Sequence, residues 1–120
     1  MATFSKQILS GSTDGKGILV AQTATAGTTI HTGSSTATTL DEVWLYAVNT
    51  SASNVKLTVE WGGVTAPNDH IEFTVNAENG LYLIVPGLIL KGNATPLVVR
   101  AFAATANVIS VHGYVNRITA

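Results

Sequence analysis

The fold of this chain is decided by the stretch Val55-Lys56-Leu57-Thr58-Val59-Glu60-Trp61. Apolar residues occupy every second position, so they fall on one side of an extended chain, with Lys56, Thr58 and Glu60 on the other. The same alternation returns in His70–Val75. Both segments therefore predict β-strands with one buried face and one wet face, as in antiparallel sheets.

Other segments on either side of this stretch are apolar on both faces. They comprise residues 43–48, 81–85, 97–103 and 108–115. A strand with two apolar faces needs a cover over each of them, because exposed apolar surface is unfavourable in water. A loop, a neighbouring subunit or an underlying protein would all serve as that cover.

Turn residues separate these segments about every 8 to 12 positions, and helical spacing of apolar residues is absent. A weaker strand pair, residues 4–9 and 17–24, flanks a glycine-rich turn. The pattern predicts an all-β fold, an antiparallel two-sheet sandwich of eight or nine short strands, either jelly-roll or immunoglobulin-like. We expect residues 1–120 to form a single domain.

Two segments stand apart from this strand pattern. Residues 25–39 consist mainly of Thr, Ser, Ala and Gly, with only Ile30 and His31 standing out. This segment is either a short strand inside a loop or a flexible arm. Residues 1–4 are a second candidate arm.

The charge of the chain excludes several functions. Six basic and seven acidic residues leave a net charge of −1, which argues against nucleic acid or an anionic membrane as a partner. No apolar run approaches the roughly 18 residues that a membrane span needs. Charged residues are only 11% of the chain, against about 25% in typical domains. The surface therefore loses little hydration free energy when another surface covers it. We therefore expect contacts within a homo-oligomer or a lattice.

Catalytic and metal-binding patterns are not found in the sequence. The three histidines, His31, His70 and His112, have none of the spacings typical of metal ligands. His70 and Glu72 share a strand face, which is most simply a solvated face, and Asp41 is expected to mark the exposed start of a strand. No serine lies in a nucleophile elbow. We expect no enzyme activity and no cofactor.

Aromatic residues are the main candidates for a functional surface. Trp44 and Tyr46 share one face of a strand, and three interpretations remain open: core packing, anchors of a protein interface, or a platform for sugar rings. The sugar interpretation would group Trp44 with Trp61 and Tyr82. The candidate interface residues are Trp44, Tyr46, Tyr82, Ile30 and His31.

The C-terminal half shows a series of strand and turn types: residues 80–92 with a Pro-Gly corner, residues 97–104 ending in small residues, and residues 107–115 of the form V-x-V-x-G-x. Upstream, residues 41–49 and 55–61 are joined by a small-residue turn. Over residues 41–119 this order resembles that of small β-sandwich virion proteins of tailed bacteriophages.

The resemblance implies a structural role in the virion. A capsid decoration (cement) protein, which binds the assembled head and stabilises it, fits best. The implied partners are the major capsid protein or another virion protein, and further copies of the chain. The implied location is the virion, after synthesis in the host cytoplasm without a signal peptide. A head–tail connector or a tail or fibre component is the alternative, and a carbohydrate-binding module is a further one.

Overall fold

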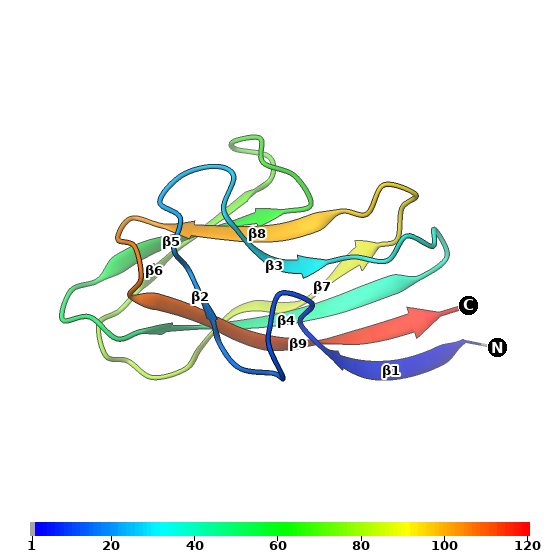
Figure 1. Cartoon of the computed structure of the whole chain (residues 1–120), viewed down its shortest axis with the longest axis horizontal. Helices are drawn as coiled ribbons and strands as arrows, with labels where there is room; N and C mark the ends of the chain where they lie inside the picture. The colour runs from blue at the N-terminus through cyan, green and yellow to red at the C-terminus, as the bar shows by residue number, and fades with distance from the viewer. Residues whose placement is uncertain (1) are drawn as a thin grey trace.

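The computed structural model describes residues 2–120. In this part of the chain there are nine β-strands and no helix, and the strands form two antiparallel sheets, as the sequence predicted (Figure 1). The strands are β1 (Thr3–Ile8), β2 (Ile18–Leu19), β3 (Thr28–Thr32), β4 (Leu40–Asn49), β5 (Val55–Trp61), β6 (His70–Val75), β7 (Tyr82–Lys91), β8 (Val98–Ala103) and β9 (Ile109–Thr119).

Strand pairing is nested along the chain. In the first sheet the order is β1-β9-β4-β7, with β2 also paired to β9, and in the second it is β3-β8-β5-β6. Thus β2 pairs with β9, β3 with β8, β4 with β7 and β5 with β6. The eight strands form one long antiparallel hairpin of four successive strand pairs, which is folded into two sheets. This is the pairing of a jelly roll, so of the two predicted sandwich types the structure has the jelly roll.

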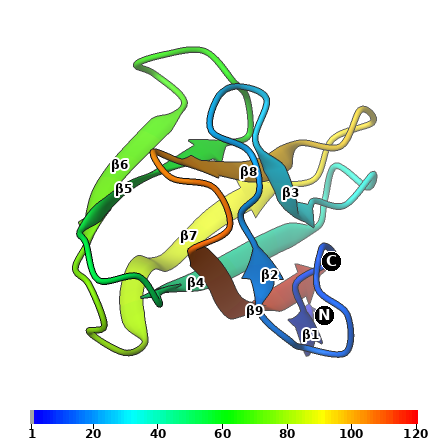
Figure 2. The same cartoon turned by 60° about the vertical axis from the view of Figure 1, so that its left-hand side comes forward.

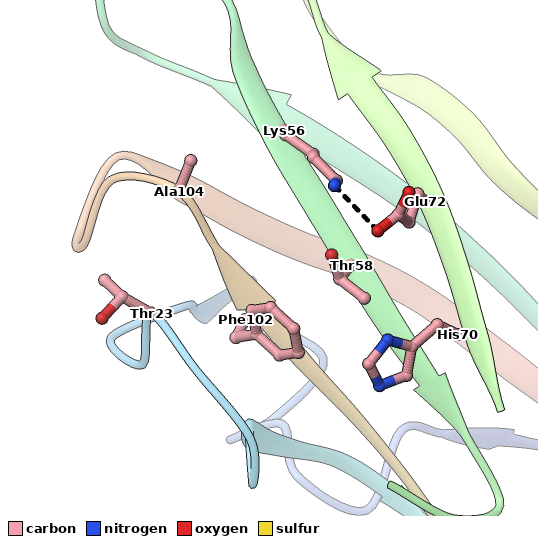
Figure 3. Close-up of a pocket in the computed structure, with 7 residues that line it drawn as sticks. All are labelled: Thr23, Lys56, Thr58, His70, Glu72, Phe102 and Ala104. Atoms are coloured by element: carbon pink, nitrogen blue, oxygen red, sulfur yellow. Dashed lines mark ion pairs between the residues drawn. The ribbon is translucent and has the colours of Figure 1, made fainter. Parts of the chain in front are cut away.

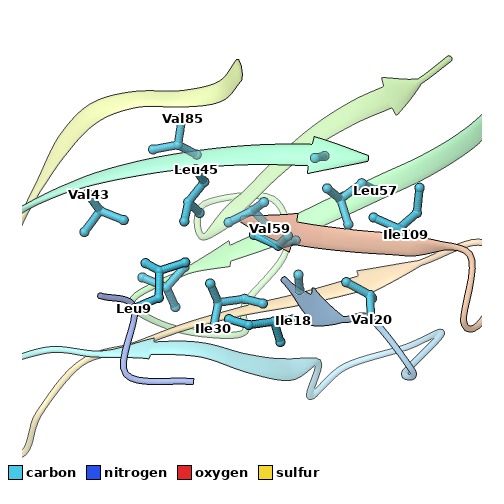
Figure 4. Packing of buried hydrophobic residues seen from close by; sticks show 14 of the residues in the cluster. Leu9, Ile18, Val20, Ile30, Val43, Leu45, Leu57, Val59, Val85 and Ile109 are labelled. Carbon is cyan, nitrogen blue, oxygen red and sulfur yellow. The ribbon is translucent and has the colours of Figure 1, made fainter. Parts of the chain in front are cut away.

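The core lies between the two sheets. On β4 every second residue is buried, so that Val43, Leu45 and Ala47 point inward. They meet Leu57 and Val59 of β5 in one cluster of buried side chains, which contains residues from both sheets (Figure 4). The alternation that predicted these strands is thus the pattern that builds the core.

Residues 25–39 do not form an arm throughout, because Thr28–Thr32 is strand β3. A register shift between Thr29 and His31 marks a β-bulge in its pairing with β8. A bulge interrupts the alternation of side chains, and the consecutive residues Ile30 and His31 are both buried. In the other candidate arm, residues 1–4, the last two residues begin β1, which pairs with β9, and Met1 lies outside the described residues.

The outer face of β5 is less exposed to solvent than the sequence predicted. Thr58 is 2% exposed and Glu60 is 0% exposed, whereas Lys56 is exposed as predicted. The segment between β2 and β3 runs from one sheet to the other (Figure 2), and its residues Thr25 and Gly27 cover Glu60, since both donate hydrogen bonds to its carboxylate. Its residue Gly27 passes so close to β8 that a Cβ there would lie 2.4 Å from the carbonyl oxygen of Ala101.

Candidate functional site

The outer face of the β1-β9-β4-β7 sheet gathers aromatic side chains. Trp44 on β4 is directly opposite Tyr114 on β9, which in turn is opposite Ile8 on β1. Residues directly opposed in antiparallel strands project on the same side. Because Val43 and Leu45, on either side of Trp44, point into the core, this row of three faces outward.

Neighbouring rows extend this surface along the sheet. Tyr46 is opposite His112 and Leu83, and Glu42 is opposite Asn116 and Ile89. Ile8, Leu83 and Ile89 are 52%, 39% and 47% exposed, and Trp44 and Tyr46 are partly exposed. We call this surface the aromatic face: Ile8, Glu42, Trp44, Tyr46, Leu83, Ile89, His112, Tyr114 and Asn116.

Contacts within the aromatic face hold its rings in fixed positions. The rings of Trp44 and Tyr114 are nearly parallel, at 12°, with centroids 6.2 Å apart. The ammonium of Lys6 lies 4.7 Å from the centre of the Tyr114 ring, within cation–π range. Gly87 of β7 leaves room for the indole, since a Cβ there would be 3.0 Å from Cζ2 of Trp44.

Glu42 supplies the polar centre of the same face. Its Oε1 accepts hydrogen bonds from the indole N–H of Trp44 at 2.7 Å and from the side-chain amide of Asn116 at 2.9 Å. These two donors hold the pKa of Glu42 below its ordinary value, because they stabilise the ionised form. A surface whose polar groups already have partners loses fewer hydrogen bonds to water when another protein covers it.

A buried ion pair lies on the inner side of the same sheet. The guanidinium of Arg117 donates from Nε to Oδ1 of Asp41 at 2.7 Å and from its terminal nitrogen to Oδ2 at 2.8 Å. Burial raises the pKa of Asp41, but the hydrogen bonds from Arg117 and His31 outweigh it and hold the pKa below its usual value. The pair is bidentate, the strongest geometry for Arg and carboxylate.

His31 completes this network in a defined tautomer. Its Nδ1 accepts the backbone N–H of Ser10 at 3.1 Å, so the proton is on Nε2, which is 2.8 Å from Oδ2 of Asp41. A histidine held in this way links the end of β1 to β3 and β4. The network is a structural one, in which hydrogen bonds from Arg117 and His31 compensate the buried carboxylate of Asp41 for its loss of water.

Only two of the five candidate interface residues lie on the aromatic face. Trp44 and Tyr46 are there, on the outer side of the sheet and not in the core. Tyr82 is 44% exposed but pairs with the inward-facing Ala47, and its ring contacts Phe73 of β6, 4.9 Å away.

Ile30 and His31 were wrong as interface candidates, since they are 0% and 1% exposed and therefore inaccessible to a partner. The expectation that Asp41 marks the exposed start of a strand was also wrong. Asp41 is 1% exposed, beside Arg117, and does not mark an exposed strand start. The sugar platform of Trp44, Trp61 and Tyr82 does not form, because Trp61 packs against the core from the other sheet.

Sequence reasoning missed Tyr114, Ile8 and Glu42 as members of the aromatic face. The available signal was the strand at residues 108–115, whose outward positions include Ser110, His112 and Tyr114. Pairing of this strand with β4 was needed to place Tyr114 next to Trp44, and sequence periodicity does not reveal pairing partners.

Within residues 2–120 no group of three or more His, Cys, Asp or Glu side chains is arranged to hold a metal ion. The same residues include no helix with the length and apolar character needed to cross a bilayer. The aromatic face has the properties of a binding surface, in which rigid aromatic rings are fixed above a well-packed sheet.

Comparisons with known proteins identify no relative. No family model, no curated protein and no solved structure matches this chain.

Proposed function

We propose that this chain is a structural virion protein of a tailed bacteriophage, a capsid decoration protein that binds the assembled head through the aromatic face. The observation that carries the proposal is that face itself. Partly exposed Trp44, Tyr46 and Tyr114 lie together on the outer face of one jelly-roll sheet, in a chain with only 11% charged residues. Trp and Tyr are the residue types most enriched at the energetic centres of protein interfaces.

The energetics of decoration suit such a face. A protein that binds the assembled shell and not its separated subunits shifts the equilibrium toward the shell. Each contact can be modest, because many identical copies act together and oligomers of the decoration protein engage several capsid subunits at once. The major capsid protein and further copies of this chain are the partners in this proposal, and the virion is its location.

The test is co-sedimentation of the purified chain with mature capsids of the phage that encodes it. Trp44→Ala and Tyr114→Ala should each weaken binding about tenfold or more. The matched control is Tyr82→Ala, which removes an exposed tyrosine away from the aromatic face and should leave binding unchanged. Wild-type affinity in both face variants, or wild-type protein that ignores capsids at micromolar concentration, would contradict the proposal.

Copy number in the particle separates decoration from the other virion roles. A decoration protein is present in many copies spread over the head, and imaging would show it at the symmetry axes of the shell. Density for the chain confined to one ring at the head–tail vertex, or to the tail, would replace decoration by a connector or tail role.

A further inference from the structure

The outer face of the second sheet contains a cavity of about 350 Å³ (Figure 3). It lies over β8, β5 and β6, at the edge of the segment between β2 and β3. Its volume is at the lower end of the range for small-molecule sites, so it suits one small ring. The lining residues are Thr23, Lys56, Thr58, His70, Glu72, Phe102 and Ala104.

Strand register brings the lining together. Thr58 in the middle of β5 is directly opposite Glu72 on one side and Phe102 on the other. The three side chains therefore project outward in one row. The partly buried ring of Phe102 forms an apolar wall of the cavity, and Thr58 offers a hydroxyl beside it.

An ion pair at the rim provides both donors and acceptors. Nζ of Lys56 lies 2.8 Å from Oε2 of Glu72, and the two side chains are 54% and 55% exposed. The pair is electrically neutral as a unit, yet it presents ammonium N–H donors and carboxylate acceptors side by side. Vicinal hydroxyl groups, each both donor and acceptor, match such a pair.

His70 at the end of the cavity has a buried carboxylate, that of Glu60, behind its ring. Oε1 of Glu60 accepts the backbone N–H of Gly27 at 2.7 Å, and Oε2 accepts the hydroxyl of Thr25 at 2.8 Å. Nε2 of His70 is 3.6 Å from the same Oε2 and makes no hydrogen bond to the described residues. A ring nitrogen that points at a carboxylate carries the proton, because a lone pair there would be repelled.

The tautomer of His70 determines what the cavity offers. With the proton on Nε2, Nδ1 is left as an acceptor, and it lies on the cavity side of the ring (Figure 3). The edge-to-face packing of His70 against Phe102, with centroids 5.7 Å apart at 73°, holds the ring in this orientation. A ligand in the cavity would therefore meet an apolar wall and an acceptor that calls for a hydroxyl donor.

Charge narrows the ligand class further. The buried Glu60 behind His70 opposes an anion, and the Lys56–Glu72 pair at the rim, neutral as a unit, adds no net charge that would attract an anion or a cation. We propose that this cavity binds a neutral sugar ring, which stacks its apolar face on Phe102 and donates a hydroxyl to Nδ1 of His70. The Lys56–Glu72 pair receives two adjacent hydroxyls of the same ring.

This site is independent of the proposed docking function. The aromatic face and the cavity lie on opposite sheets, so a copy bound to a shell through the aromatic face keeps its cavity open to solvent. Trp44→Leu therefore serves as a control that should leave sugar binding unchanged, and Phe102→Leu should leave capsid binding unchanged.

The experiment is an NMR titration of the ¹⁵N-labelled chain with glucose, galactose, mannose and N-acetylglucosamine. Sialic acid and glucosamine are the anionic and cationic comparisons. We expect at least one neutral sugar to shift the amide signals of Thr58, Glu72 and Phe102 with a Kd of about 1 mM, typical of a single small contact surface. Phe102→Leu should weaken that binding about tenfold, and the same spectrum reports whether the variant is folded.

Two further variants test the role assigned to His70. His70→Asn keeps an acceptor close to the position of Nδ1, whereas His70→Gln keeps a polar group toward Glu60 and loses that acceptor. Binding should be retained in the first variant and fall about tenfold in the second. The reverse order would overturn the assignment of His70.

The proposal as a whole fails if no neutral sugar shifts these signals at about 50 mM, well above the expected Kd. It also fails if sialic acid binds better than every neutral sugar. A glycan array distinguishes two possible ligands, a free monosaccharide and the terminal sugar of a polysaccharide. A site specific for the free monosaccharide would show binding only in the titration, whereas a site for the terminal sugar would also show binding on the array. Either result supports the site.

Discussion

The two outer faces of the sandwich are built on equivalent strands but differ in their exposure. β4 and β5 follow each other in the chain, and each is flanked by strands on both sides within its own sheet. On β4 the outward residues Trp44 and Tyr46 are partly exposed, whereas on β5 the outward residues Thr58 and Glu60 are buried. The larger apolar side chains are thus on the more open face, and a carboxylate is under the more covered one.

The difference comes from the chain segment between β2 and β3. This segment crosses to the second sheet and gives Glu60 a backbone donor and a hydroxyl donor, which compensate its loss of water. Within residues 2–120 no such segment covers Trp44 and Tyr46, which are partly exposed. We conclude that the polar groups of the covered face contribute to stability, and that the rings of the aromatic face are available for binding.

Among the changes at outward-facing positions, removal of Glu60 should have the largest effect on stability. Glu60→Ala leaves the buried N–H of Gly27 and the hydroxyl of Thr25 without an acceptor, so we expect the free energy of unfolding to fall by about 3 kcal/mol. Urea unfolding followed by tryptophan fluorescence measures it. The matched control is Glu72→Ala on the adjacent strand, an exposed carboxylate whose loss should cost less than about 0.5 kcal/mol. Equal effects of the two changes would show that the segment over Glu60 does not bury it in solution.

Gly113 tests the packing that supports the aromatic face. A Cβ at this position of β9 would lie 2.0 Å from the carbonyl oxygen of Trp44, so Gly113→Ala must push β9 away from β4. We expect a loss of about 2 kcal/mol in the free energy of unfolding. Thermal unfolding measures it, with Ser110→Ala on the same strand as a control that should be nearly neutral. A neutral Gly113→Ala would mean that the two strands are less closely paired than the structure shows.

The class of fold could be predicted from the sequence because the alternation within each single strand already identifies the residues of the core. The alternation from Val55 to Trp61 shows which side of the strand is apolar without any knowledge of its neighbouring strands. Several sandwich topologies are compatible with this alternation, and the jelly-roll pairing is one of them. The separation of Trp44 and Tyr46 from Val43 and Leu45 was visible for the same reason. Their outward orientation was not, since either side of an apolar strand can face the core.

The errors share one physical cause, which is contact between residues distant in sequence. Asp41 looks like an exposed strand start until Arg117, 76 residues later, is placed beside it. Glu60 looks solvated until Gly27, 33 residues earlier, donates to it. The bulge that buries both Ile30 and His31 depends on pairing with β8 and has no local signal in a polar segment.

Acid should distinguish the inner from the outer carboxylate of the same sheet. The folded-state pKa of Asp41 is held below its unfolded value by Arg117 and His31, so its stabilisation is complete above about pH 5 and is lost as pH falls through the folded pKa. Asp41→Asn should therefore flatten the loss of stability below about pH 4. Glu42→Gln should flatten it less, because Glu42, whose pKa is also lowered, is on the outer face, where solvent screens it. Urea unfolding from pH 7 to pH 3 measures both variants, and a steeper profile for Asp41→Asn would contradict the ion pair.

The smallest expected effect on stability is at the centre of the aromatic face. Trp44→Leu loses the stacking on Tyr114 and the hydrogen bond to Glu42, both at a partly exposed position, so unfolding should change by less than about 1 kcal/mol. Its inward neighbour is the contrast, because Leu45→Ala empties a fully buried position and should cost about 3 kcal/mol. If Trp44→Leu instead destabilised the fold as much as Leu45→Ala, the indole would belong to the core and the aromatic face would lose its central residue as a binding surface. A small effect on unfolding, combined with lost affinity for capsids, would place the role of Trp44 in binding.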